Sequence, residues 1–305
     1  MQQISHLIDG QTVAGKSGNT TAVYNPATGE QTGTLDLASV QEVDHAVASS
    51  KKAFEDWQTV SVAQRTKLLY NFRNLVEANA EEIARRLTAE HGKVNSDAQG
   101  EVARGLENIE FSCGVSEALK GTYTEHASTG VDVYSVRQPL GVCAGITPFN
   151  FPAMVPLWMF PNAVACGNTF ILKPSERDPS APRFIVELAQ EAGFPPGVVN
   201  LINGDKVAVD RLLEHSDVKA ISFVGSTPIA KYVYATGAAH GKRVQALGGA
   251  KNHMIVLPDA DIDLAADAAV SAAYGSAGER CMAISVVVAV GDVADDLVAA
   301  IKKRI

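Results

Sequence analysis

The stretch Gly141-Val-Cys-Ala-Gly-Ile-Thr-Pro-Phe-Asn-Phe-Pro152 begins as an apolar run and ends in a polar turn. A short apolar run bounded by turn residues predicts a buried strand, here residues 141–147. The pattern recurs along the chain and predicts further strands at 169–172, 198–202, 220–224, 243–246 and 253–257, with helices at 152–166, 180–192, 205–215 and 227–238. Strands that alternate with helices favour right-handed crossovers and a parallel sheet covered on both faces. The predicted fold class is therefore α/β.

The residues before this region have a different pattern. Residues 1–38 contain turn signals around short β-rich pieces, which predict a small layer of strands. Helices are predicted from there to about residue 119, and Ser39 with Glu42 has the spacing of a capping box. Residues 97–119 are predicted to form one helix. Residues 121–137 are predicted to form two strands around a turn.

The composition excludes several classes of protein. The chain has 305 residues and a net charge of −8, with no block of Lys and Arg, which argues against a nucleic-acid or membrane partner. The four cysteines have no CxxC spacing, so neither a metal site nor a disulfide framework is expected, and a reduced, cytoplasmic setting is favoured. The start of the chain has no signal-peptide pattern. The most apolar segment, residues 151–166, is too short and too rich in proline to span a bilayer.

A second stretch, Gly275-Ser-Ala-Gly-Glu-Arg-Cys-Met-Ala283, lies between a predicted helix at 263–274 and an apolar run at 284–290 that predicts a buried strand. Cys281 therefore lies on a tight connection. Because a cation stabilises a thiolate, Arg280 is expected to lower the pKa of Cys281. Taken alone, Cys281 could equally be a packed cysteine, since free cysteines are often buried.

Polar clusters follow several of the predicted parallel strands, at the ends where ligands bind in such sheets. Asn150 follows the first strand, Lys173 and Glu176 follow the second, and Gly225-Ser-Thr227 opens a helix. Backbone N–H groups at a helix start, with the Ser226 hydroxyl, suit a phosphate. Each cluster alone has a plainer explanation: a turn residue, a solvated ion pair or a helix cap.

Taken together, the motifs Pro148-Phe-Asn-Phe-Pro152, Lys173-Pro-Ser-Glu176, Phe223-Val-Gly-Ser-Thr227, Leu247-Gly-Gly249 and Gly278-Glu-Arg-Cys281 resemble the aldehyde dehydrogenase superfamily along essentially the whole chain. Lys251-Asn-His253 and the segment 274–283 resemble its CoA-acylating methylmalonate-semialdehyde dehydrogenase branch. This resemblance implies a Rossmann-like NAD-binding domain at 1–120 and 138–246. It also implies an oligomerisation hairpin at 121–137 and the start of a second α/β catalytic domain at 247–305. A homo-oligomer, dimer or tetramer, is implied for the full-length form.

The resemblance also implies a role for particular residues. Cys281 matches the nucleophile, which would attack the aldehyde and carry a thioester, and the Asn150 amide would hold the oxyanion. Lys173 and Glu176 match the residues that hold the adenine ribose, where a carboxylate favours NAD over NADP. Further cofactor contacts are implied at Thr147, Phe149, Gly225, Ser226 and Leu247.

Two departures from the family pattern matter. Hydrolytic members carry a Glu just before Leu-Gly-Gly as the base for the deacylating water, whereas this chain has Ala246, which cannot take a proton. Another nucleophile, the CoA thiol, is therefore expected to take the acyl group. Family members also continue well past Ile305, so the chain is expected to be truncated at its C-terminus, and the activity of the 305 residues alone is open.

Two arginines are candidates for substrate binding. Malonate or methylmalonate semialdehyde carries a carboxylate that Arg104 and Arg280 could bind. The alternative is that Arg104 pairs with Glu101 or Glu107 on its own helix and has no further role.

The predicted function is NAD-dependent, CoA-acylating oxidation of a carboxylated semialdehyde to propionyl- or acetyl-CoA with loss of CO₂. Two alternatives remain: a hydrolytic aldehyde dehydrogenase, against which Ala246 argues, and an inactive NAD-binding fragment, for which the missing C-terminal part argues. A Cys-His hydrolase is disfavoured because no histidine stands out as a partner of Cys281.

Overall fold

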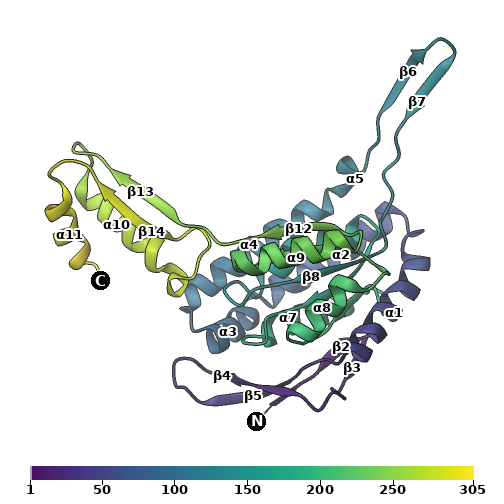
Figure 1. Cartoon of the computed structure of the whole chain (residues 1–305), viewed down its shortest axis with the longest axis horizontal. Helices are drawn as coiled ribbons and strands as arrows, with labels where there is room; N and C mark the ends of the chain where they lie inside the picture. The colour runs from purple at the N-terminus through teal and green to yellow at the C-terminus, as the bar shows by residue number, and fades with distance from the viewer. Residues whose placement is uncertain (1) are drawn as a thin grey trace. The chain divides into compact units, whose positions relative to one another are not determined.

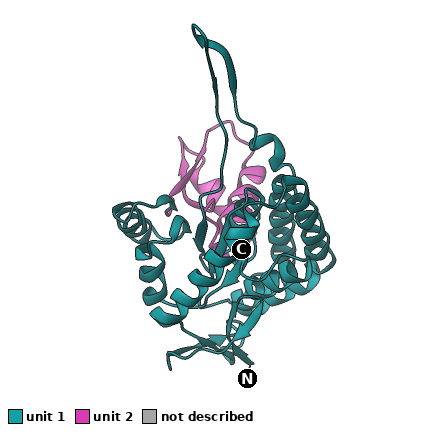
Figure 2. Cartoon of the chain, turned by 90° about the vertical axis from the view of Figure 1, so that its right-hand side faces the viewer, with its two compact units in different colours: residues 1–247 teal, residues 248–305 magenta. Residues whose placement is uncertain are grey.

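A computed structural model describes residues 2–305 and divides into two compact units, residues 1–247 and 248–305 (Figure 2). The division falls next to the boundary predicted at 246/247. The domain assignment itself stays a prediction.

Unit 1 is built on a seven-stranded sheet of order β12-β11-β8-β9-β10-β2-β3 (Figure 1). The five strands from β12 to β10 pair in parallel, and β2 and β3 add an antiparallel edge. The predicted parallel α/β sheet is thus confirmed. The strands are β2 (His6–Ile8), β3 (Gln11–Val13), β8 (Val142–Ile146), β9 (Thr169–Lys173), β10 (Val199–Leu201), β11 (Val218–Val224) and β12 (Arg243–Leu247).

Helices cover both faces of this sheet because successive residues of each strand point to opposite faces. On one face, α1 (Val40–Trp57), α8 (Lys206–Glu214) and α9 (Thr227–Ala239) share a core with Val142, Ala144 and Ile146 of β8. On the other face lies the core of α2 (Val62–Ala78), α3 (Ala80–His91), α4 (Asn95–Cys113), α6 (Met154–Ala165) and α7 (Ser180–Glu191). The capping box predicted at the start of α1 is present.

Two predictions for the first part of the chain need correction. The strand layer predicted at 1–38 divides: β1 (Gln2–Ile4), β4 (Thr20–Tyr24) and β5 (Gln31–Asp36) form a separate three-stranded sheet, whereas β2 and β3 join the main one. The single helix predicted at 97–119 ends at Cys113, and α5 (Val115–Ala118) follows as a separate turn of helix. Gly114, which lacks the side chain that favours a helix interior, stands at the break.

The predicted hairpin is formed by β6 (Tyr123–Ser128) and β7 (Val131–Tyr134) and projects from the rest of unit 1 (Figure 1). Every residue of its two strands is exposed. No helix of the described residues is long and apolar enough to cross a membrane.

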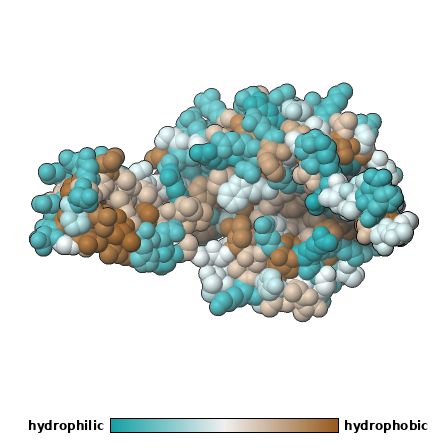
Figure 3. All heavy atoms as spheres, turned by 90° about the horizontal axis from the view of Figure 1, so that it is seen from above, coloured by the Kyte–Doolittle hydropathy of each residue, from teal (hydrophilic) through white to brown (hydrophobic). Residues whose placement is uncertain are grey.

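Unit 2 contains two parallel strands, β13 (Asn252–Val256) and β14 (Ile284–Ala289), with α10 (Ile262–Tyr274), a short 3₁₀ turn (Gly275–Gly278) and α11 (Ala294–Lys302). The strand predicted at 284–290 is present as β14, but the prediction that it is buried was wrong, because none of its residues is fully buried. The helices cover one face of the sheet, which buries Val256, and leave Ile255 and Val288 exposed on the other. In Figure 3, where unit 2 is the smaller lobe at the left, apolar side chains gather on its surface.

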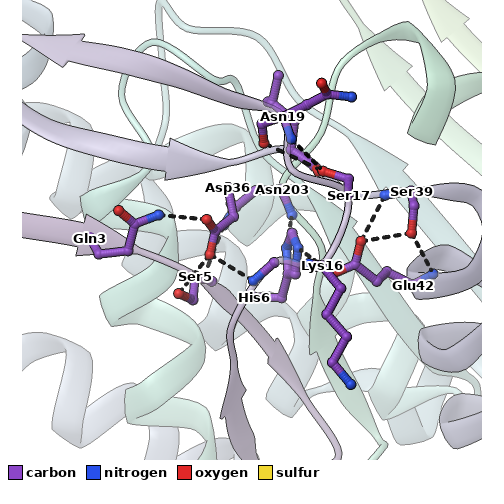
Figure 4. A network of polar contacts seen from close by, with 12 residues as sticks. Gln3, Ser5, His6, Lys16, Ser17, Asn19, Asp36, Ser39, Glu42 and Asn203 are labelled. Atoms are coloured by element: carbon purple, nitrogen blue, oxygen red, sulfur yellow. Dashed lines mark hydrogen bonds and ion pairs between the residues drawn. The ribbon is translucent and has the colours of Figure 1, made fainter.

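A buried polar network ties the N-terminal strands to the main sheet (Figure 4). The His6 ring is fully buried; its Nδ1 accepts the Asn203 backbone N–H at 3.1 Å, and its Nε2 lies 3.6 Å from Glu42 Oε1. Burial lowers the pKa of His6 below its ordinary value, although the Glu42 and Asp36 carboxylates oppose part of that effect. The native network therefore needs a neutral His6.

This network predicts a loss of stability in mild acid. Below about pH 6.5 an unfolded chain protonates His6 while the native state resists, so the free energy of unfolding falls as pH falls through that range. Chemical denaturation at pH 7 and pH 5 should show this loss, and His6→Asn, which keeps an acceptor but does not titrate, should reduce it. The exposed His45→Asn is the matched control. Equal losses in the wild type and His6→Asn would contradict the prediction.

Candidate functional site

The register of the parallel strands brings the predicted cofactor residues of unit 1 to one edge of the sheet. Ile146 of β8 pairs with Lys173 of β9 and with Phe223 of β11, and Val224 of β11 pairs with Leu247 of β12. The carboxyl ends of four adjacent strands therefore lie side by side, which is the position where open α/β sheets bind ligands.

Thr147 and Phe149 leave β8 at this edge. The Thr147 backbone N–H donates to the Lys173 carbonyl at 3.1 Å, and its buried hydroxyl has no hydrogen-bond partner among residues 2–305. The Phe149 ring stacks against the His91 ring, with 6.3 Å between the ring centroids. The Arg177 guanidinium lies over the Phe149 ring, 4.9 Å from its centroid. A buried hydroxyl without a hydrogen-bond partner is rare. The Thr147 hydroxyl could therefore donate a hydrogen bond to a bound ligand or accept one from it.

Lys173 and Glu176 are brought together as predicted. Lys173 Nζ is buried, bonds the Gly204 carbonyl at 2.8 Å and lies 3.2 Å from Glu176 Oε2. Burial raises the pKa of Glu176, but the Lys173 ammonium and a backbone hydrogen bond outweigh burial, so the net pKa lies below its ordinary value. Glu176 is thus a half-buried carboxylate that stays ionised at neutral pH.

Gly225 and Ser226 form a tight turn between β11 and α9. The Gly225 N–H donates to the Leu247 carbonyl at 3.1 Å, and a Cβ at position 225 would lie 2.4 Å from the Phe223 ring. Ser226 is exposed and sits at the N-cap with an extended backbone, yet its side chain makes no capping bond within the described chain. The first N–H groups of this helix and the Ser226 hydroxyl can therefore bind an anion.

Ala246 lies on β12, opposite Phe223 in the register, and its methyl group packs against the core of the α1 face. Position 246, where the resemblance implies the base of hydrolytic members, therefore carries no proton acceptor.

Cys281 lies in unit 2, on the turn that precedes β14. The Ala283 N–H donates to the Arg280 carbonyl at 3.0 Å, which closes a turn around Cys281, and the Cys281 side chain is exposed. The Asn252 side-chain amide donates to the carbonyls of Cys281 and Ala283 at 2.9 and 3.0 Å. The exposed thiol contradicts the alternative of a packed cysteine.

The approach to this turn is strained. Ser276 and Ala277 have positive φ angles of 54° and 57°, a conformation that residues with a Cβ rarely adopt. The Arg280 guanidinium lies close to Gly275: a Cβ at position 275 would be 2.8 Å from it, so a larger residue would make this flexible side chain shift.

Arg104 is exposed on α4, and its Nη1 lies 2.9 Å from both carboxylate oxygens of Glu107. This is the pairing that the alternative interpretation expected. An exposed ion pair contributes little stability and exchanges readily, so Arg104 can leave Glu107 for another carboxylate.

Sequence reasoning missed two anchors. Asn252 belongs to the Lys-Asn-His motif, but nothing in that motif shows that its amide holds the Cys281 turn. Lys93 and Glu101 form a fully buried ion pair next to Asn150, although charged residues are ordinarily expected at the surface. Among the described residues no group of three or more His, Cys, Asp or Glu could hold a metal ion.

Comparison with known proteins shows which family the chain resembles. Residues 12–305 match the model of the aldehyde dehydrogenase family. A malonate-semialdehyde dehydrogenase of Pseudomonas aeruginosa is 55% identical over 306 residues, which cover 100% of this chain and 61% of that protein.

Two solved structures are also similar. The methylmalonate-semialdehyde dehydrogenase of Oceanimonas doudoroffii has a TM-score of 0.97 at 54% identity and covers 100% of this chain, which spans 62% of it. A putative methylmalonate-semialdehyde dehydrogenase of Sinorhizobium meliloti, complexed with NAD, has a TM-score of 0.97 at 54% identity, with 99% of this chain and 62% of that one covered. The chain thus spans about three fifths of these relatives, and it belongs to the aldehyde dehydrogenase family.

Proposed function

We propose that the protein oxidises malonate or methylmalonate semialdehyde with NAD and transfers the acyl group to CoA with loss of CO₂. The observation that carries the proposal is the alignment of Thr147, Lys173 and Ser226 at one sheet edge in a chain whose relatives bear these semialdehyde names.

The residues at the sheet edge fit a dinucleotide. The Thr147 hydroxyl lacks a partner among the described residues, and the start of α9 can take a phosphate. Gly225 lets the chain turn tightly against the Phe223 ring just before that helix. Lys173 and Glu176 would hold the ribose hydroxyls, with Phe149 and Leu247 as further contacts. The ionised Glu176 would repel a 2′-phosphate, which favours NAD over NADP. When bound, the nicotinamide accepts the hydride.

Cys281 is the nucleophile of this proposal. Its thiolate attacks the aldehyde carbon, and the Asn150 side-chain amide stabilises the oxyanion that forms. Once the hydride has been given up, Cys281 would carry the acyl group as a thioester. Arg104 and Arg280 would hold the substrate carboxylate until it leaves as CO₂.

Ala246 decides how the thioester is released. Attack by water needs a base, whereas a thiol near neutral pH is partly ionised and intrinsically nucleophilic. CoA is therefore the acceptor in this proposal. A hydrolytic enzyme whose base lies elsewhere is the second candidate, and an inactive NAD-binding fragment is the third.

Two further features belong to the proposal. The exposed hairpin side chains of Tyr123, Val133 and Tyr134 suit contacts between subunits of a dimer or tetramer. A cytoplasmic location is proposed from the four cysteines, which are free in the described structure.

Rapid mixing tests the proposed function. The full-length protein with NAD and semialdehyde should give a burst of about one NADH per site and then a slow phase, because general-base help worth about 10²–10⁴ in rate is missing at Ala246. CoA should convert the slow phase into steady turnover. Cys281→Ala should abolish the burst and leave NAD binding near normal. Steady turnover that is equally fast without CoA would favour the hydrolytic alternative.

Glu176→Gln tests the cofactor preference. The amide keeps the size of the side chain and removes the charge that would repel a 2′-phosphate, so kcat/KM for NADP should rise relative to NAD. Steady-state kinetics with both cofactors measures this ratio. A wild-type protein that uses both equally would show that Glu176 does not discriminate.

Arg104→Leu tests the carboxylate clamp. Loss of one guanidinium should lower kcat/KM for malonate semialdehyde. The corresponding loss of transition-state binding free energy should be roughly 2–5 kcal/mol, the typical cost of leaving a charge unpaired. Propanal, which has no carboxylate, should be used almost as before. Glu107→Gln, which removes only the surface partner, is the control. Equal losses on both aldehydes would mean that Arg104 has a structural role.

A further inference from the structure

A buried ion pair lies directly behind the segment that carries Asn150. Lys93 Nζ is 2.5 Å from Glu101 Oε2, and neither side chain has exposed surface. Lys93 follows Gly92, which ends α3 with a left-handed backbone (φ 87°), and Glu101 lies within the first two turns of α4. The pair therefore comes from the α3–α4 junction, far in sequence from Asn150.

Lys93 also bonds the backbone of Asn150 itself. Its Nζ lies 2.8 Å from the Asn150 carbonyl oxygen and 4.4 Å from the centroid of the neighbouring Phe151 ring. A charged donor forms a stronger hydrogen bond than a neutral one, and burial excludes water as a competitor. The Asn150 peptide is thus fixed from the side of α3.

Glu101 fixes the other end of the same segment. Its Oε1 accepts the backbone N–H groups of Ala153 and Met154 at 2.8 and 3.0 Å. These groups lie at the start of α6, where the N-cap residue is alanine and has no side chain that can cap. Glu101 supplies the missing cap and places its charge at the positive end of the helix dipole.

One ion pair thus holds the backbone at Asn150, Ala153 and Met154. Stability alone does not require such a device, because well-packed apolar residues often stabilise a protein as well as a buried ion pair does. An apolar pair could not bond three backbone groups in fixed positions. The two charges therefore fix the positions of these backbone groups, which an apolar pair could not do.

We propose that Lys93 and Glu101 are positioning residues that set the Asn150 backbone, and through it the oxyanion-binding amide. The inference rests on the proposed function, since it needs Asn150 to bind the oxyanion. The two residues touch neither substrate nor cofactor in this proposal; they act through Asn150.

The test is a double-mutant cycle in the full-length protein, read as the rate of the NADH burst. Loss of an oxyanion donor typically slows chemistry about 10²–10³-fold, so Asn150→Ala should fall in that range. Glu101→Gln keeps an acceptor for Ala153 and Met154 but removes the charge, and should slow the burst about 10- to 100-fold. The variant Asn150→Ala/Glu101→Gln should be no more than about twofold slower than Asn150→Ala, because residues that act through one group are not additive.

Two measurements distinguish a positioning role from a general loss of folded structure. The Kd for NAD and the rate at which iodoacetamide alkylates Cys281 should stay within about twofold of wild type in Glu101→Gln, since neither needs an oxyanion site. Glu110→Gln is the matched control: it removes a surface partner of Arg73 from the same helix and should not slow the burst. If Glu101→Gln does not fold, Lys93→Met/Glu101→Gln, which removes both charges of the ion pair, replaces it.

Each outcome decides the inference. The inference would be overturned if the two substitutions slowed the burst independently, so that their effects multiplied in the double variant. A Glu101→Gln burst as fast as that of the wild type would also overturn it, and in both cases the oxyanion assignment of Asn150 would stand. An Asn150→Ala burst as fast as wild type would overturn both the inference and the oxyanion assignment. Loss of NAD binding in Glu101→Gln together with the burst would mean that the ion pair only maintains the fold.

Discussion

The parallel register of β12, β11, β8 and β9 is the constraint on which the candidate site depends. It places residues that are up to about a hundred positions apart, from Thr147 to Leu247, at the carboxyl ends of adjacent strands. Parallel pairing needs a crossover for every strand, so α6 and α9 must begin at this same edge. Both helices therefore present unpaired N–H groups where they begin. One of these helix starts is left for an anion, and the other is capped by Glu101.

Much of this frame could be predicted because its signals are local. Apolar runs ending in turn residues locate β8 and β9 to within a residue or two, so Lys173 at the end of β9 and Glu176 just after it could be placed at the sheet edge. Burial of β14 could not be predicted, because an apolar run has the same pattern whether one face of its sheet is covered or both. The division of residues 1–38 between two sheets also depends on distant partners: β2 pairs with β10, almost two hundred residues away.

The anchors of the two candidate catalytic loops escaped prediction for a shared reason. Lys93, Glu101 and Asn252 bond backbone groups, and every residue offers the same backbone groups whatever its side chain. The sequence at the receiving end therefore carries no trace of the contact. A buried Lys-Glu pair is also contrary to the usual placement of charge, so composition and spacing point away from it. Contacts of this kind are visible only once the fold is known.

The two loops are held in physically different ways, and the difference matches what each is proposed to do. Asn150 is held by a fully buried ion pair that water does not reach. This suits a hydrogen-bond donor that must be oriented before charge develops on the substrate. Cys281 is exposed on a turn that accepts hydrogen bonds from the neutral Asn252 amide and follows a strained backbone, which suits a group that is proposed to accept, carry and release an acyl chain. Rigid anchoring would oppose those steps, whereas a loose oxyanion donor would lose its effect. The fully buried ion pair thus supports the residue that is proposed to bind charge without reacting, and not the proposed nucleophile.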